Sequence, residues 1–143
     1  MKQRTHYVAG FLFNRQETEV VLIRKNRPAW QKGLLNGVGG KIEQGESPSF
    51  AMTREFKEET GMNVEGWAEF ACLEFDKACV HFFMAHSDVY QVSSLTDEEV
   101  NVYLVISLPE LQTIPNIQWL IPMALSMSAD DANQFTVCAW YGA

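Results

Sequence analysis

The segment that decides the fold of this chain spans residues 40–62 and reads GKIEQGESPSFAMTREFKEETGM. Ser47 is a favourable N-cap, and Pro48 falls at the first helical position, where the missing N–H of proline costs nothing. Gly61 can adopt the left-handed conformation that commonly ends a helix. The segment therefore predicts a capped helix that begins after Ser47 and ends at Gly61.

Acidic side chains gather on one side of this predicted helix. At about 100° per residue, Glu55, Glu58 and Glu59 fall within roughly one third of the helix circumference. Met52 and Phe56 form the neighbouring apolar stripe, which we expect to face a core. Like charges at these spacings repel one another unless a cation compensates. Oxygen ligands of this kind suit Mg²⁺ or Mn²⁺, whereas a solvated acidic face is the alternative reading for the glutamates alone.

The spacing of the whole segment favours the metal-binding reading. Its defined positions are, in order, Gly40, five residues, Glu46, seven residues, Arg54-Glu55-Phe56, one residue, Glu58-Glu59, one residue and Gly61-Met62. This pattern matches the Nudix box at every defined position, and a chance match is rarer than roughly one in a million. The chain therefore resembles the Nudix hydrolases, and it is most similar to their MutT-like, nucleotide-sanitising branch. The motif is specific for the family and says little about the substrate.

The rest of the chain predicts the elements around this helix. We expect strands at residues 6–13, 20–23, 67–75, 78–85, 100–106 and 135–141, turns at 14–17, 76–77 and 128–133, and a helix at 117–127 that Pro122 interrupts. These elements indicate an α/β protein. The resemblance implies the Nudix fold, a mixed curved β-sheet sandwiched between α-helices, with residues 1–143 as a single domain.

The composition indicates a small globular protein with a small-molecule substrate. The 143 residues are 47% hydrophobic, which is enough for a proper core. A net charge of -7 argues against binding a nucleic-acid polymer by electrostatics alone, although metal ions can supply positive charge for a polyphosphate. No apolar run approaches the length of a membrane span, and no signal peptide is recognised. We therefore expect a cytoplasmic protein that makes no membrane contact, either as a monomer or as a homodimer.

The cysteines and histidines form no recognisable motif. Cys72, Cys79 and Cys138 are odd in number, lie in strand-like runs and lack CxxC spacing, so we expect buried free thiols in a reducing compartment. His81 and His86 lie in or beside a predicted strand, where a lone histidine is more often a packed or surface residue than a ligand.

The resemblance implies roles for the residues of the box. Mg²⁺, with Mn²⁺ as the alternative, would be held by the carbonyl oxygen of Gly40 and by the three glutamates that the box places on the helix, Glu55, Glu58 and Glu59. Arg54 would orient these glutamates through salt bridges. Glu46 would anchor the loop that precedes the helix.

The sequence does not identify which carboxylate is the general base. In different Nudix relatives either Glu55 or Glu59 corresponds to the carboxylate that takes a proton from the attacking water. In Nudix folds a glutamate from a later loop often swings toward the metals. The acidic loop at residues 96–99 is the matching region here, and Glu98 is the first candidate within it.

Four residues are candidate contacts to the substrate: Asn36, Lys41, Asn116 and Trp119. In relatives that hydrolyse oxidised purine triphosphates, an asparagine at the place of Asn36 contacts the base. Those relatives also carry acidic residues that hydrogen-bond the edge of the base, and Asn116 occupies the corresponding place here. Asn116 can both donate and accept hydrogen bonds, so purine recognition in altered form and a site for a pyrimidine or another group are both open. Trp119 either stacks on a base or fills the core.

The basic loop at residues 24–28 and the following Trp30 also have two readings. They form either a solvated connection or a group of cations and an aromatic ring beside a phosphate and base pocket.

Three functions follow from the resemblance. The first is hydrolysis of an unmodified or oxidised nucleoside triphosphate to the monophosphate and pyrophosphate. The second is hydrolysis of ADP-ribose or a dinucleoside polyphosphate, but the proline and tyrosine typical of those branches are replaced near residues 77–80. The third is a catalytically silent nucleotide-binding module, which typically loses glutamates of the box. This chain keeps them all, so the first function is favoured.

Overall fold

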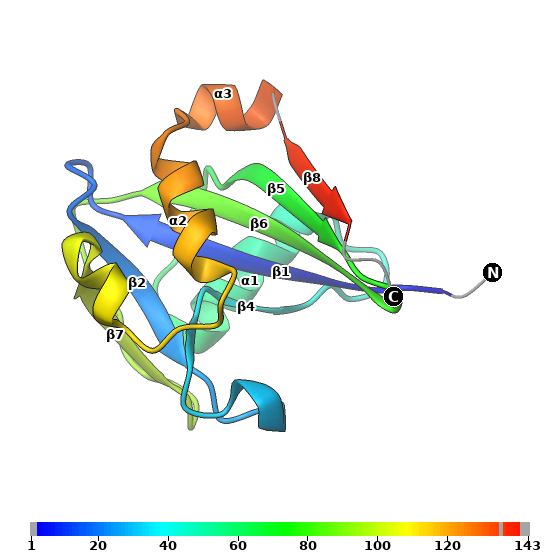
Figure 1. The fold of residues 1–143 in the computed structure, drawn as a ribbon, viewed down its shortest axis with the longest axis horizontal. Helices are drawn as coiled ribbons and strands as arrows, with labels where there is room; N and C mark the ends of the chain where they lie inside the picture. The colour runs from blue at the N-terminus through cyan, green and yellow to red at the C-terminus, as the bar shows by residue number, and fades with distance from the viewer. Residues whose placement is uncertain (1–2, 135, 141–143) are drawn as a thin grey trace.

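The computed structural model describes residues 3–134 and 136–140. Its centre is a mixed β-sheet, with α1 (Pro48–Thr60) on one face and α2 (Ile117–Leu125) and α3 (Ala129–Gln134) on the other (Figure 1). This arrangement confirms the expected α/β Nudix fold, in which helices cover both faces of the sheet.

The sheet mixes parallel and antiparallel pairs. Its strands are β1 (Thr5–Phe13), β2 (Glu19–Arg24), β3 (Leu35–Asn36), β4 (Val38–Lys41), β5 (Ala68–Glu74), β6 (Ala78–His86), β7 (Glu99–Leu104) and β8 (Val137–Trp140). The order is β3-β2-β1-β6-β5-β8, while β4 pairs with β1 and β7 pairs with β2. The β1–β6 and β5–β8 pairs are parallel, and the others are antiparallel. Short 3₁₀ helices span Ala29–Gln31 and Val105–Glu110.

Strand β1 places the glycine-rich strand β4 in the middle of the sheet. One edge of β1 pairs with β6 along its full length. The other edge is divided, because β4 pairs with residues 7–10 and β2 pairs with residues 12–13. The loop that leads from β4 to α1 therefore starts from a strand that is held at the centre of the molecule.

Alternating side chains of β1 supply both halves of the core. Phe11 and Phe13 lie in the cluster that α2 covers, and Leu12 lies in the cluster under α1. Met52 and Phe56 of α1 are fully buried in the second cluster, as the helical spacing predicted. Each contributes about 1.5–3 kcal/mol by burial.

The predicted caps of α1 are confirmed. The hydroxyl of Ser47 accepts a hydrogen bond from the backbone N–H of Phe50 at 3.2 Å. Gly61 has φ 79° and donates its N–H to the carbonyl of Lys57. The helix that carries the glutamates is thus fixed at both ends by local contacts.

Four predictions differ from the structure. Pro122 lies inside α2, which runs from Ile117 to Leu125 and is not interrupted. The predicted turn at 128–133 instead forms most of α3, because Ser128 and Asp131 cap each other: the Ser128 hydroxyl accepts from the Asp131 N–H at 3.1 Å, and the Ser128 N–H donates to Oδ2 of Asp131 at 3.5 Å. The strand predicted at 100–106 ends at Leu104 and continues as a 3₁₀ helix. Cys138 is exposed, since β8 is an edge strand, whereas Cys72 and Cys79 are buried as expected.

Strand β8 covers part of the run expected at 135–141; residues 135 and 141 lie outside the described residues. Among the described helices, none is both long enough and apolar enough to cross a membrane.

Candidate functional site

Arg54 on α1 organises the acidic residues of the box. Its guanidinium makes a two-point salt bridge with Glu46, with Nε–Oε2 at 2.6 Å and Nη2–Oε1 at 2.8 Å. Nη1 donates to Glu55 at 2.9 Å and to Glu58 at 3.2 Å. Nη2 also donates to the carbonyl of Lys41 at 3.1 Å. One side chain therefore joins the end of β4, the connecting loop and two of the three glutamates.

These contacts set the charge state of Glu46. The hydrogen bonds from Arg54, helped by the one that the carboxylate accepts from the N–H of Glu43, lower the pKa of Glu46 to about 2. The same carboxylates raise the pKa of Arg54. The pair is therefore ionised throughout the physiological range and holds the loop before α1 against the helix.

The catalytic candidates Glu55 and Glu59 have the opposite shift. Burial raises the pKa of Glu55, and Arg54 only partly opposes this effect. Burial also raises the pKa of Glu59, against the hydrogen bond that it accepts from Thr96, with Glu98 and Glu58 adding repulsion. Both carboxylates therefore sit where a further positive charge would stabilise their ionised forms.

Gly40 is in direct contact with Glu55. A Cβ atom added to Gly40 would lie 2.5 Å from the carboxyl carbon of Glu55, so a side chain there would overlap the carboxylate. Glycine at this position allows the backbone of β4 and the acidic face of α1 to meet. The predicted metal ligands Gly40 and Glu55 are thus neighbours in space, although they are fifteen positions apart in the sequence.

The residues of the box fit a hard divalent cation. The donors are oxygen atoms, the carboxylates carry more negative charge than Arg54 balances, and burial penalises that charge. The three carboxylates have different partners: Arg54 holds Glu55 and Glu58, and Thr96 holds Glu59. Some described side chains already lie close enough to share a metal ion, in groups of three with ligand atoms within 4.8 Å of one another. These groups lie outside the box.

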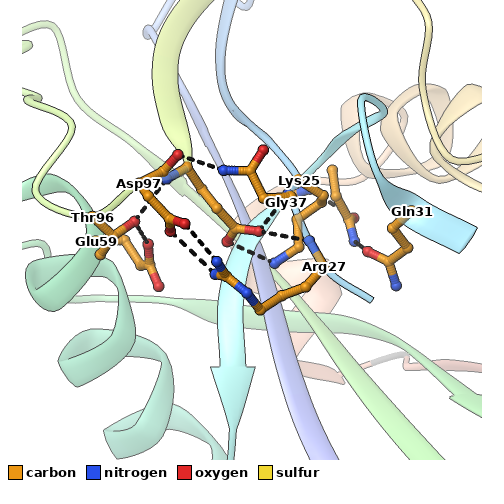
Figure 2. Close-up of polar contacts among 10 residues, drawn as sticks. Lys25, Arg27, Gln31, Gly37, Glu59, Thr96 and Asp97 are labelled. Atoms are coloured by element: carbon orange, nitrogen blue, oxygen red, sulfur yellow. Dashed lines mark hydrogen bonds and ion pairs between the residues drawn. The ribbon is translucent and has the colours of Figure 1, made fainter. Parts of the chain in front are cut away.

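Glu98 is buried and turned toward the basic loop. Its Oε1 accepts from Nζ of Lys25 at 3.0 Å, and its Oε2 accepts from the N–H of Asn26 at 2.7 Å (Figure 2). Burial would raise the pKa of Glu98, but these hydrogen bonds outweigh it and keep the pKa below its usual value. In this conformation Glu98 anchors the loop of residues 25–27, and its role as a base stays a prediction that requires the side chain to leave Lys25.

The acidic loop nevertheless reaches the box. Thr96 donates to Glu59 at 3.0 Å, and Asp97 pairs with Arg27, so the basic loop, the acidic loop and α1 form one connected network (Figure 2). The predicted loop of cations is therefore ordered by acidic partners beside the box.

A cavity of about 440 Å³ adjoins the glycine strand. Two of the four predicted substrate contacts, Asn36 and Asn116, line it, together with Gly40 and the side chain of Trp30. Apolar residues of the sheet, among them Val80, form much of its wall. Such a mostly apolar cavity with a few polar groups is typical of small-molecule sites.

The polar groups at the mouth of the cavity contact one another. The Oδ1 atom of Asn36 accepts from the N–H of Gly37 at 2.7 Å, and its Nδ2 atom donates to Gln31 at 3.4 Å (Figure 2). Gln31 also lines the cavity, and sequence reasoning did not select it. Its place beside Trp30, in a loop already considered for a base pocket, was the available signal.

The other two predicted contacts lie apart from this cavity. Trp119 is half-exposed on α2, and Lys41, at the end of β4, lines a second hollow; neither belongs to the described lining. The aromatic residue at the cavity is Trp30, which is 65% exposed. Trp30 and Lys25 therefore lie where the base-pocket reading of this loop needs them, and that reading stays a prediction.

Comparisons with known proteins agree with this geometry. The model of the NUDIX domain family matches residues 4–140. A 69-residue stretch is 32% identical to the 8-oxo-dGTP diphosphatase of Escherichia coli K12; the match covers 48% of this chain and about half (54%) of that relative.

Solved structures show the same fold. A MutT structure from a study of Aliivibrio salmonicida and Vibrio cholerae aligns with TM-score 0.75 and 26% identity, covering 87% of this chain and 98% of the other. The MutT protein of Bacillus halodurans aligns with TM-score 0.76 and 18% identity, covering 96% and 89%. The NUDIX domain of Shewanella oneidensis NrtR, solved with ADP ribose, aligns with TM-score 0.73 and 16% identity, covering 88% and 89%.

The match over residues 4–140 spans nearly the whole chain and includes every residue of the box. The chain therefore belongs to the NUDIX domain family.

Proposed function

We propose that this protein is a Mg²⁺-dependent pyrophosphohydrolase that cleaves a nucleoside triphosphate to the monophosphate and pyrophosphate. The observation that carries the proposal is the position of Gly40. A Cβ atom at Gly40 would overlap the carboxylate of Glu55, and Gly40 also lines the 440 Å³ cavity. A nucleoside in the cavity would therefore have its phosphates beside the glutamates of the box.

Mg²⁺, or Mn²⁺, bound by Gly40 and by Glu55, Glu58 and Glu59 would neutralise phosphate charge as it develops. Arg54 keeps Glu55 and Glu58 oriented, and Glu46 keeps Arg54 in place. A water oxygen would bond to one phosphorus of the anhydride between the α- and β-phosphoryl groups while the bond from that phosphorus to the bridging oxygen breaks. This step releases the monophosphate and pyrophosphate, and one proton of the water passes to a carboxylate.

Glu55 and Glu59 are the candidates to receive that proton. Burial raises the pKa of each, which makes a carboxylate a better base near neutral pH. Glu98 is held by Lys25 and Asn26, so it ranks behind them in this conformation.

The relative from Escherichia coli suggests the first substrate to test, an oxidised guanine triphosphate. Asn36 and Asn116 can each donate and accept hydrogen bonds at the cavity, which suits a base edge that presents both kinds of group.

A substrate panel tests the proposal. Unmodified and oxidised nucleoside triphosphates, ADP-ribose and diadenosine polyphosphates are incubated with the protein and Mg²⁺, and the products are separated. We expect the highest kcat/KM for a triphosphate, with pyrophosphate as product and no turnover in excess EDTA. Preferred cleavage of ADP-ribose would move the proposal to the second function, and turnover of no substrate would favour a silent binding module.

A further inference from the structure

A second cluster of metal-ligating side chains lies on the face of the sheet that carries α1. Strands β1 and β6 pair in parallel, with His6 opposite Cys79 and Val8 opposite His81. Residues two apart in a strand point to the same face, so the side chains of His6, Cys79 and His81 converge. One ligand atom from each lies within 4.8 Å of the others.

The two distances from His81 to the other members of this cluster match those around a tetrahedral zinc ion. Nδ1 of His6 lies 3.2 Å from Nε2 of His81, and Sγ of Cys79 lies 3.8 Å from the same Nε2. Ordinary zinc bond lengths place two nitrogen ligands about 3.3 Å apart and a nitrogen and a sulfur about 3.6 Å apart. Both separations agree within a few tenths of an ångström.

Glu69 favours the tautomer of His81 that can bind a metal through Nε2. Its Oε2 lies 2.9 Å from Nδ1 of His81, so a proton on Nδ1 can be donated to the carboxylate. The lone pair of Nε2 then faces His6 and Cys79. A carboxylate behind a ligating histidine is the usual support for zinc. A Cys79 thiolate and the Glu69 carboxylate together would also balance the charge of a divalent ion.

The cluster can be reached from solvent. His6 is exposed, and both histidines line a hollow of about 720 Å³. Water from this hollow can complete the coordination. The sulfur atoms of Cys72 and Cys79 are 3.0 Å apart. Two thiolates bound to the same zinc ion would be roughly 3.8 Å apart, so Cys72 is not assigned as a ligand.

We propose that His6, Cys79 and His81 form a binding site for a divalent transition metal, with Zn²⁺ the best match and the fourth position open to water. Nitrogen and sulfur donors favour zinc over Mg²⁺, whereas the oxygen donors of the box favour Mg²⁺. The ion would fasten the start of β1 to β6. It would also support the loop after β4, because the carbonyl of His6 accepts from the N–H of Ile42 at 2.9 Å.

Cobalt titration tests this site without relying on activity. The full chain is reduced, freed of metal and titrated with Co²⁺ in excess Mg²⁺, which occupies the glutamates of the box. We expect one equivalent of tetrahedral Co²⁺ with a thiolate-to-metal charge-transfer band, which Zn²⁺ removes by displacing the cobalt.

Matched variants locate the signal. His6→Asn changes an exposed side chain and should weaken binding at least about tenfold, while Cys79→Ala should remove the charge-transfer band. Glu69→Gln should weaken binding about 10- to 100-fold. His86→Asn, which alters a histidine bonded to Glu17, and Cys138→Ser, which alters an exposed cysteine, should keep wild-type binding.

Thermal unfolding supplies an independent measurement. With excess Mg²⁺ present, Zn²⁺ should raise the Tm of the wild type more than that of His6→Asn, because the ion binds only the folded cluster and binds the variant more weakly. Absence of a thiolate band in the wild type, or its persistence in Cys79→Ala, would overturn the proposal. So would an equal Tm shift in the two proteins, since His6 and His81 would then be a hydrogen-bonded pair only.

Discussion

Arg54 shows how one residue can organise an acidic site. Its guanidinium contacts three carboxylates and a backbone carbonyl, and a bidentate contact to Glu46 fixes its plane. Lysine could supply the charge but not this geometry. The orientation of Glu55 and Glu58 therefore depends on a residue that need not touch the substrate.

The pH dependence of stability should reveal the Arg54–Glu46 pair. The folded pKa of Glu46 is about 2, below its ordinary value of 4.5, so the pair stabilises the protein fully above pH 4.5 and less as the pH falls toward 2. Glu46→Gln should therefore unfold at a lower Tm than the wild type at pH 7. This difference should shrink between pH 4.5 and pH 2 in thermal scans; a constant difference would contradict the assignment.

Asn36 should govern discrimination among bases. Loss of a base hydrogen bond costs about 1–3 kcal/mol, because the remaining polar groups are left unpaired, so Asn36→Ala should lower discrimination roughly tens-fold. The measurement is kcat/KM across the nucleotide panel. Because Asn36 also bonds Gly37 and Gln31, thermal unfolding of Asn36→Ala is the control for loop structure. A uniform loss on every substrate would assign Asn36 to the loop alone.

At the scale of elements, the contact between β4 and α1 builds the site. Two adjacent glycines of β4 have different neighbours. A Cβ on Gly40 would meet the Glu55 carboxylate of α1, which can move, whereas a Cβ on Gly39 would overlap the backbone carbonyl oxygen of Val8 in β1. Gly40 therefore makes room for the Glu55 carboxylate, and Gly39 makes room for the close approach of β4 to β1.

This difference predicts opposite effects of two similar substitutions. Gly40→Ala should displace Glu55, lower kcat/KM about tenfold or more and change Tm little. Gly39→Ala should break the β1–β4 pairing and cost about 3 kcal/mol or more of unfolding free energy. Activity assays and urea unfolding of both variants test the pair. Equal stability of the two variants would show that β4 can shift as a whole.

At the scale of the whole molecule, a net charge of -7 makes cation binding a source of stability. The three glutamates of the box repel one another, and Arg54 compensates only part of their charge. A cation that binds only the folded state shifts unfolding toward higher temperature.

Mg²⁺ should therefore raise the Tm of the wild type and have little effect on Glu58→Gln. Without Mg²⁺ this variant should be as stable as the wild type, since Glu58 is 57% exposed and its pair with Arg54 is worth at most about 0.5 kcal/mol. Its kcat/KM should fall on the order of a hundredfold. Glu65→Gln, at another exposed glutamate, is the control; wild-type activity of Glu58→Gln at saturating Mg²⁺ would refute the site.

Local sequence patterns were enough to predict α1, its caps, its buried stripe and the family. Helix rules act between residues up to four positions apart, so Ser47, Gly61, Met52 and Phe56 carried the necessary information. The same kind of local signal, the mutual capping of Ser128 and Asp131, was present at α3 and was missed.

The contacts between residues that are distant in the sequence became known from the folded structure. It placed Glu55 on Gly40, Glu98 against Lys25, Trp30 rather than Trp119 at the cavity, and His6 beside Cys79 and His81. These contacts depend on the strand order and on the register of each strand pair. A change of register by one residue moves every side chain of a strand to the other face of the sheet. Local sequence patterns do not specify the register between segments about 70 residues apart. The cluster of His6, Cys79 and His81 therefore forms because β1 pairs with β6.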